Sequence, residues 1–271
     1  MICNNCPHNC DICEGGTGIC HARSNTGGKI ICENYGKVTS LALDPIEKKP
    51  LAMFFPGSMI LSAGSYGCNM HCMWCQNDSI SRGKVLADTL TCEELCDIAI
   101  DTKKRGNIGL AYTYNEPSVG YEFVLDCARL IKQNKMVNVM VTNGMLAPDR
   151  FDALIPYMDA YNIDLKTSDA DKYASIGGSL DVITRNIKAA ADNGKHVELT
   201  TLVVPGFNDD EDDFSRIVGI VSCIGRSVPL HITRFFPAAQ YKDYSPTGLE
   251  TLYRFRDMAV TELANVFLGN V

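Results

Sequence analysis

The stretch SMILSAGSYGCNMHCMWC (residues 58–75) decides the fold of this chain and predicts its chemistry. It begins with an apolar run typical of a buried strand, and Cys68, Cys72 and Cys75 follow at spacings of four and three residues. Iron–sulfur clusters normally take four thiolates, so three thiols can ligate three irons of one [4Fe–4S] cubane and leave the fourth iron open. An open iron indicates a cluster that carries out chemistry rather than simple electron transfer.

A zinc knuckle is the alternative for this loop, because His71 lies inside it and could supply a fourth ligand. Zinc motifs, however, pair their ligands as CxxC with a second pair some distance away. Here Trp74, the only tryptophan of the chain, stands just before the last cysteine, and the loop follows a strand. The carboxyl end of a strand is where barrel-type α/β folds hold their sites, which favours the cluster.

The cysteine loop resembles the cluster loop of radical S-adenosylmethionine (SAM) enzymes. The resemblance implies that SAM chelates the open iron through its amino and carboxylate groups. It further implies that reductive cleavage of the SAM sulfonium yields a 5′-deoxyadenosyl radical, and that a one-electron donor such as a ferredoxin or flavodoxin is a partner.

Length and composition predict one large catalytic domain. The chain has 271 residues, is 46% apolar and carries a net charge of −7 without a Lys/Arg-rich run, which makes nucleic acid an unexpected partner. No apolar stretch approaches the length of a membrane span. The N-terminus MICNNCPHNC is neither basic nor apolar, so it does not resemble a signal peptide. We therefore expect the 13 cysteines to be metal ligands or free thiols in a reducing cytoplasm.

Strand-like and helical patterns alternate along the rest of the chain. The expected strands are 58–64, 107–112, 136–141, 160–165, 196–204 and 229–233. The expected helices are 91–105, 119–132, 148–157, 180–193, 211–224 and 249–263. Six βα units imply a parallel sheet with right-handed crossovers. The predicted fold is therefore α/β, a partial (β/α)6 TIM-type barrel over residues 41–271.

Polar side chains follow the predicted strands, at the end where a barrel holds its site. The stretch 112–117 (YTYNEP) occupies the place where many radical SAM enzymes carry a Gly-Gly-Glu that binds the SAM amino group, with Tyr114 and Asn115 replacing the two glycines. The resemblance thus implies a set of SAM-contacting residues. They are Trp74, Asn77, Thr113, Tyr114, Asn115, Glu116, Thr142, Asn143, Asp164, Lys166, Thr201 and His231.

Structural roles remain alternatives for part of this set. Thr142 and Asn143 could cap the next helix, and Thr201 could be an ordinary β-branched strand residue. Asp164 and Lys166 point to the same side of a strand and form either a polar site or a salt bridge at the rim. His231 is either a site residue or a core histidine with satisfied hydrogen bonds.

Further motifs narrow the resemblance. Residues 43–51 (LDPIEKKPL), 75–77 (CQN), 111–117 (AYTYNEP), 164–166 (DLK), 201–209 (TLVVPGFND) and 231–237 (HITRFFP) are similar to the branch that contains pyruvate formate-lyase activating enzymes, and within it to AmmeMemoRadiSam-type proteins. Activating enzymes of that branch abstract a hydrogen from a glycine Cα of a partner protein. The resemblance therefore implies a protein or peptide substrate.

The N-terminal 40 residues are expected to form a separate Cys-rich unit. Cys3, Cys6, Cys10 and Cys20 lie in a stretch too poor in aliphatic residues to fold by burial alone, so a metal would organise it. Four thiolates suit either Zn²⁺ or a second [4Fe–4S] cluster, and unmetallated thiols are the remaining alternative. Cys13 and Cys32 are additional thiols in this unit. The cysteines in helical patterns are expected to be small buried residues: Cys92, Cys96, Cys127 and Cys223.

Two functions from different classes follow. The first is an enzyme in which a SAM-derived radical takes hydrogen from a substrate held in the barrel mouth. The second is a non-catalytic Fe–S or zinc protein in electron transfer or assembly. The predicted barrel and its polar strand ends favour the enzyme, because a carrier needs no substrate cavity.

Overall fold

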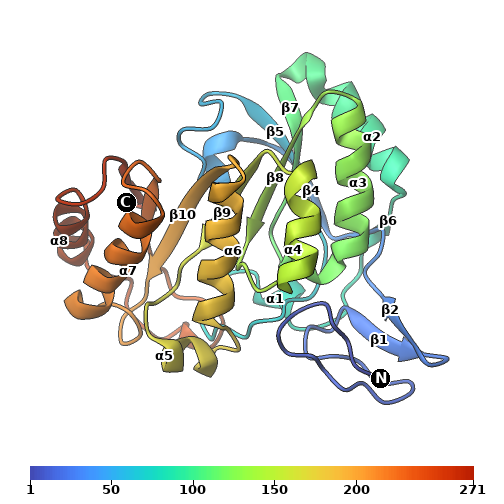
Figure 1. Cartoon of the computed structure of the whole chain (residues 1–271), viewed down its shortest axis with the longest axis horizontal. Helices are drawn as coiled ribbons and strands as arrows, with labels where there is room; N and C mark the ends of the chain where they lie inside the picture. Colours follow the sequence, from blue (N-terminus) through green and yellow to red (C-terminus); the bar gives the residue numbers. More distant parts are fainter.

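A computed structural model describes all 271 residues, and its centre is an eight-stranded sheet in the order β12-β11-β10-β9-β8-β7-β5-β4 (Figure 1). The strands are β4 (Ser40–Pro45), β5 (Met59–Gly64), β7 (Asn107–Tyr112), β8 (Val137–Thr142), β9 (Ala160–Asp164), β10 (His196–Val203), β11 (Leu230–Arg234) and β12 (Val266–Gly269). All pairings are parallel except that of β4 with β5. The predicted α/β partial barrel is confirmed, and its six expected strands all form.

Helices connect the strands and cover the outer face of the sheet (Figure 1). They are α2 (Cys92–Asp101), α3 (Tyr121–Gln133), α4 (Pro148–Leu154), α6 (Leu180–Asp192), α7 (Glu211–Ile224) and α8 (Leu249–Ala259). Two shorter helices, α1 (Asp78–Ser81) and α5 (Ala170–Ser175), lie in loops. Thr91 and Glu94 form a capping box at the start of α2. A core of 47 buried residues lies between the helices and the sheet.

Short elements complete the chain. They are β1 (Arg23–Thr26), β2 (Lys29–Cys32), β3 (Lys37–Val38), β6 (Asp88–Thr89), η1 (Ile46–Lys48), η2 (Thr102–Arg105), η3 (Pro117–Gly120), η4 (Ile155–Tyr157) and η5 (Ala239–Tyr241). The expected helices 91–105 and 148–157 each end in one of these 3-10 turns, η2 and η4. In the second case Pro156 lacks the N–H that would continue the α-helix.

The structure adds two strands that the sequence pattern did not predict. β4 pairs antiparallel with β5 at one edge, and β12 pairs with β11 at the other. Both are mostly half-buried or exposed, so neither carries a clear alternation of buried and exposed residues. After β4 the chain crosses the inner face of the sheet. There Ile46 and Leu51 are fully buried against Ile60, Ala111 and Val139.

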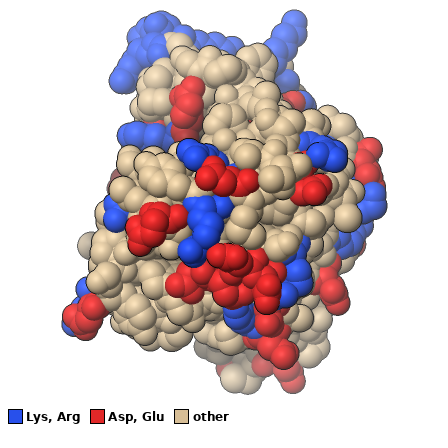
Figure 2. Space-filling view, turned by 90° about the vertical axis from the view of Figure 1, so that its left-hand side faces the viewer, with Lys and Arg blue, Asp and Glu red and all other residues tan.

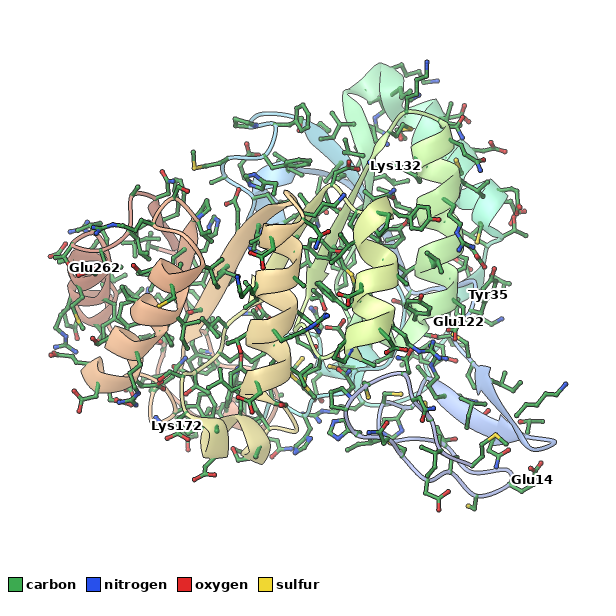
Figure 3. The ribbon with its side chains drawn as sticks, viewed as in Figure 1. Glu14, Tyr35, Glu122, Lys132, Lys172 and Glu262 are labelled. Atoms are coloured by element: carbon green, nitrogen blue, oxygen red, sulfur yellow. The ribbon has the colours of Figure 1, made fainter.

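The N-terminal segment packs against the end of the sheet at which the parallel strands finish (Figure 1). It consists of loops and the antiparallel hairpin β1–β2. Arg23 anchors it, because the guanidinium donates to both carboxylate oxygens of Glu122, at 2.8 and 2.6 Å, and to the carbonyl of Val119 at 2.9 Å. Glu122 lies in the first turn of α3, beside these loops (Figure 3).

The surface carries both signs of charge. On the face shown in Figure 2, acidic side chains gather in the lower half and basic ones are most extensive at the top. Helix α7 begins with the exposed Glu211 and Asp212 and the buried Asp213. Carboxylates stabilise the positive N-terminal end of a helix. No helix is both long and apolar enough to cross a membrane.

Candidate active site

A cavity of about 440 Å³ opens at the carboxyl ends of the parallel strands. Cys68, Cys72 and Cys75 all line it. So do most of the predicted SAM-contacting residues, namely Trp74, Asn77, Thr113, Tyr114, Asn115, Glu116, Thr142, Asn143, Asp164 and Lys166. These residues come from four different segments of the sequence. The parallel sheet brings them to one mouth because all its strands finish at the same edge.

The cluster loop is fastened to the end of β7 by two asparagine amides. Asn115 accepts a hydrogen bond from the backbone N–H of Ser65 at 2.9 Å and donates one to the carbonyl of Gly67 at 3.0 Å. Asn77, on the far side of the cysteines, donates to the carbonyl of Tyr114 at 2.7 Å. Both amides are therefore occupied in holding the loop at its two ends.

Position 67 accepts only glycine. Its φ of +92° lies in a region that L side chains rarely adopt, and a Cβ there would lie 2.5 Å from the carbonyl oxygen of Cys20. Tyr114 also has a positive φ, +71°, at a position where the resembled family uses glycine. A side chain at Gly64 would meet Tyr114 at 2.8 Å, so this glycine makes room for the tyrosine.

Tyr114 connects the cavity to a buried ion pair. Its hydroxyl donates to Asp44 at 2.8 Å, and Lys49 donates to the same carboxylate oxygen at 2.9 Å. The Lys49 ammonium also lies 4.7 Å from the centre of the Tyr114 ring. Burial alone would raise the pKa of Asp44, but Lys49 and Tyr114 outweigh it and hold the pKa at about 2. Lys49 therefore places a positive charge in the cavity wall, and the Asp44 carboxylate balances it.

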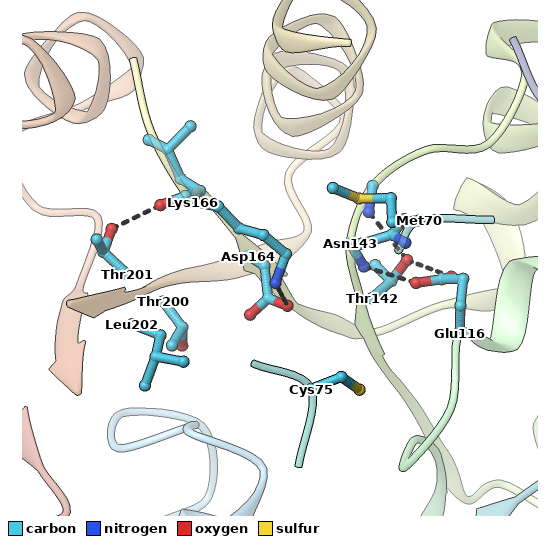
Figure 4. Close-up of polar contacts among 12 residues, drawn as sticks. Met70, Cys75, Glu116, Thr142, Asn143, Asp164, Lys166, Thr200, Thr201 and Leu202 are labelled. Atoms are coloured by element: carbon cyan, nitrogen blue, oxygen red, sulfur yellow. Dashed lines mark hydrogen bonds and ion pairs between the residues drawn. The ribbon is translucent and has the colours of Figure 1, made fainter. Parts of the chain in front are cut away.

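Glu116 organises the ends of β7 and β8 (Figure 4). One carboxylate oxygen accepts from the Thr142 hydroxyl at 2.7 Å and from the Ser118 N–H at 2.9 Å, and the other accepts from the Asn143 N–H at 2.7 Å. Burial raises the pKa of Glu116, although these hydrogen bonds act in the opposite direction. The Asn143 amide in turn lies 3.8 Å from the sulfur of Cys68, which ties this network to the cluster loop.

Asp164 and Lys166 form an ion pair in the cavity wall, with 2.7 Å between Nζ and Oδ2 (Figure 4). Burial by itself lowers the pKa of Lys166, but the Asp164 carboxylate outweighs it, so the pKa rises above its ordinary value. Lys166 therefore stays protonated beside Cys72. The pair lies within the cavity and not at an outer rim.

Trp74 and Thr113 are buried in the same wall. The indole packs against Phe207, with ring centres 4.4 Å apart, and against Tyr241 at 5.7 Å. Trp74 thus anchors the last cysteine of the loop to the far side of the barrel.

Thr201 and His231 lie outside the cavity, which corrects their expected placement. Thr201 stands between Thr200 and Leu202, which do line the cavity, and strand alternation turns its side chain to the opposite face (Figure 4). Its hydroxyl donates to the carbonyl of Leu165 at 2.7 Å.

His231 lies one layer deeper than the cavity residue Thr233 on β11. Its Nε2 is 2.6 Å from a carboxylate oxygen of Glu198, and its ring stacks on Phe267. His231 is therefore a core histidine with a satisfied hydrogen bond, as the structural alternative stated.

Some cavity residues were not proposed as site residues from the sequence. They are Lys48, Lys49, Pro50, Met70, Gln76, Ser81, Val141, Thr200, Leu202, Thr233 and Asn270. For Lys49 a signal was available, since the motif of residues 43–51 places a lysine pair next to Asp44 and Glu47 in one short stretch. No such signal marks Asn270, which reaches the cavity only through the pairing of β12 with β11.

The three thiols fit a cluster better than a zinc ion. They line one cavity, whereas His71 is not among its lining residues and its ring lies close to Gly177. A cubane spreads its thiolates over separate irons, so three thiols that line one cavity suit it. Burial raises the pKa of Cys68 and of Cys72, and a bound cationic metal would stabilise their thiolates.

Comparison with known proteins identifies relatives over most of the chain. The sequence profile of the Radical SAM superfamily matches residues 63–217. An uncharacterized protein of Methanocaldococcus jannaschii is 41% identical, over 99% of this chain and 81% of that protein. A GTP 3′,8-cyclase of Pelotomaculum thermopropionicum is 30% identical over 71% of this chain, and this chain spans 64% of that enzyme.

Solved structures share the fold at low sequence identity. A domain of pyruvate-formate lyase-activating enzyme from Bacteroides vulgatus has a TM-score of 0.52 at 16% identity, covering 60% of this chain and 99% of that domain. A radical SAM methyltransferase from Sphaerobacter thermophilus has a TM-score of 0.59 at 15% identity, covering 80% of this chain and 67% of that enzyme. Likeness at these identities concerns the fold alone.

Proposed function

Because this chain belongs to the radical SAM superfamily and carries its thiols and polar strand ends in one cavity, we propose that it is an activase-like enzyme that abstracts hydrogen from a protein or peptide substrate. Cys68, Cys72 and Cys75 would hold the [4Fe–4S] cluster. Together the cluster and SAM supply a reductive cleavage that yields a 5′-deoxyadenosyl radical. The observation that carries the proposal is the 440 Å³ cavity that all three cysteines share with the polar strand ends.

The polar groups of the cavity match the polar groups of SAM. Lys166 is a buried donor for the carboxylate of SAM, and Asp164 retains an oxygen, Oδ1, that has no protein partner and can accept from an ammonium or a ribose hydroxyl. Thr113, Thr142 and Asn143 line the same wall. The network around Glu116 fixes Thr142 and Asn143, so the cavity is preorganised.

Asn77, Tyr114 and Asn115 act differently in this proposal. Their side chains hold the cluster loop and the Asp44–Lys49 pair, so they position the site around SAM. Trp74 closes the wall and keeps water from the reacting atoms. Thr201 and His231 support the barrel from outside the cavity.

A glycyl residue of a partner protein is the substrate class that the motif resemblance favours. The electron comes from a one-electron donor such as a ferredoxin or flavodoxin. All 13 cysteines are free thiols in this structure, which agrees with a reducing compartment such as the cytoplasm.

Reconstituted protein incubated with SAM and dithionite tests the chemistry. We expect 5′-deoxyadenosine and methionine, whereas a non-catalytic carrier would give neither. The Cys72→Ala variant is the matched negative control, and the exposed Cys223→Ala is the positive one.

The substrate class is tested with a glycine-containing partner peptide deuterated at the glycine Cα. Deuterium in the recovered 5′-deoxyadenosine supports a glycyl substrate. Deoxyadenosine formed without deuterium from any glycyl peptide overturns the activase assignment while leaving the radical chemistry intact.

A further inference from the structure

The N-terminal segment gathers four thiols that the proposed reaction does not use. Cys3, Cys6 and Cys20 are buried, and Cys10 is half-buried. A backbone hydrogen bond from Cys3 N to Cys10 O, 2.9 Å long, brings the ends of the first loop together. A Cβ placed on Gly18 would lie 3.7 Å from the Cys10 sulfur, so Cys10 reaches toward the loop that carries Cys20.

These four thiols are neighbours. Cys6 lies close to the thiols of Cys20 and Cys10. Cys20 lies close to the thiols of Cys3 and Cys10. Cys13 is exposed and Cys32 is paired with other groups, since its thiol donates to Asn34 at 3.2 Å. The group of neighbouring thiols therefore consists of Cys3, Cys6, Cys10 and Cys20 and excludes Cys13 and Cys32.

Apolar burial does not explain why these thiols are inside. The core cluster of this region contains only Cys20, Ala22 and Val119, and the other N-terminal thiols belong to no apolar cluster. A segment of this size with so small a core needs another source of stability. No disulfide supplies it, because all the cysteines are free.

The four-thiol group lies directly against the catalytic loop. The carbonyl of Cys20 approaches Gly67 so closely that only glycine fits, and His8 Nε2 lies 2.7 Å from the carbonyl of Asn69. The Asn69 side chain stands next to the Cys6 thiol. The same side chain accepts a hydrogen bond from Asn143 at 2.9 Å, and Asn143 contacts the Cys68 sulfur.

We propose that Cys3, Cys6, Cys10 and Cys20 ligate a second [4Fe–4S] cluster, which is held beside the cysteine loop of the active site. Four thiolates complete its coordination, so this cluster has no open iron and does not bind SAM. Four thiolates could also hold a zinc ion, and elemental analysis separates the two. The cluster supplies the stabilisation that the segment lacks. Its ligands are separate from those of the active site, so the proposal stands or falls independently of the proposed reaction.

Iron, acid-labile sulfide and zinc are measured on anaerobically reconstituted full-length variants. We expect about eight irons per wild-type chain and about four in Cys6→Ala/Cys10→Ala, whose remaining cluster changes its EPR spectrum on addition of SAM. The variant Cys68→Ala/Cys72→Ala/Cys75→Ala should also keep about four irons, but its EPR spectrum should not respond to SAM. This second variant retains the N-terminal thiols, so it keeps the test decisive even if the first does not fold.

Cys13→Ala is the matched control from the same segment, because its exposed thiol lies outside the group, and it should keep the full iron content. About one zinc per chain that is lost in Cys6→Ala/Cys10→Ala would overturn the cluster in favour of a zinc site. Complete loss of iron from the triple active-site variant would overturn a metal cluster at the N-terminal thiols.

Discussion

Lys166 Nζ lies 2.7 Å from Asp164 Oδ2 in the wall of the cavity that also holds Cys72. The ion pair neutralises a buried ammonium beside a prospective cluster ligand and leaves Oδ1 of Asp164 free to face the cavity. A carboxylate with one committed and one uncommitted oxygen is both positioned and able to bind.

Replacement of Asp164 by Ala should weaken SAM binding without changing the iron content. Loss of a hydrogen bond to a charged group costs about 1.5–3 kcal/mol, roughly tenfold to a hundredfold in the SAM dissociation constant. Equilibrium binding of SAM to the reconstituted protein measures this dissociation constant. Asp152→Ala removes an exposed carboxylate paired with Arg185 and is the matched control. A dissociation constant within twofold of wild type would show that Asp164 does not contact SAM.

Each of Cys68→Ala, Cys72→Ala and Cys75→Ala should abolish SAM cleavage. Two thiolates do not hold a cubane stably in water, so about four irons per chain should be lost. Deoxyadenosine formation and iron content are measured together. The control variant is Cys96→Ala. It removes a buried thiol of α2 that does not line the cavity, so it shows the effect of losing a cysteine that is no cluster ligand. Deoxyadenosine production by any one of the three active-site variants would contradict the ligand assignment.

Asn115→Ala should reduce cluster retention as well as SAM binding. The sequence predicted that Asn115 contacts SAM, but its amide holds Ser65 and Gly67 at the start of the cluster loop. Loss of these two hydrogen bonds should cost about 1–3 kcal/mol in the stability of the loop. Iron remaining after gel filtration measures retention. Asn134→Ala removes an amide that bonds the helix carbonyl of Leu130 and serves as control. An unchanged iron content together with weaker SAM binding would instead indicate that Asn115 contacts SAM directly.

Glu198 should contribute stability that is lost in acid. Burial alone would raise its pKa, but hydrogen bonds from His196, His231 and two backbone N–H groups lower it from 4.5 to about 2. A depressed pKa stabilises the folded state above pH 4.5, and this stability is lost as the pH falls toward 2.

The matched comparison is wild type against Glu198→Gln in urea unfolding at a series of pH values. Near neutral pH the variant should be less stable by about 1–3 kcal/mol, because buried donors lose a charged partner. The difference should shrink by about 0.8 kcal/mol at pH ~4. A gap that stays constant from neutral pH to pH ~4 would mean that Glu198 titrates normally in the folded protein.

The cysteine spacing and the alternation of strand and helix patterns were sufficient to predict the barrel and the cluster loop. The edge strands β4 and β12 were not predictable, because each is only partly buried and is defined by its pairing partner. The sequence placed Asp164 and Lys166 on one side of a strand, and the structure places that side in the cavity. It also predicted Thr201 for the site, whereas the alternation of β10 directs Thr200 and Leu202 inward.

The sequence by itself determined the features that depend on near neighbours along the chain: three thiols within eight residues, the capped start of α2 and the six βα units. Tertiary structure alone decided which polar groups are free to bind and which are already paired. Asn115 meets Gly67 across 48 residues, and His231 meets Glu198 across 33. Local patterns carry no information about such distant partners, because the barrel fixes them only when its strands align in register.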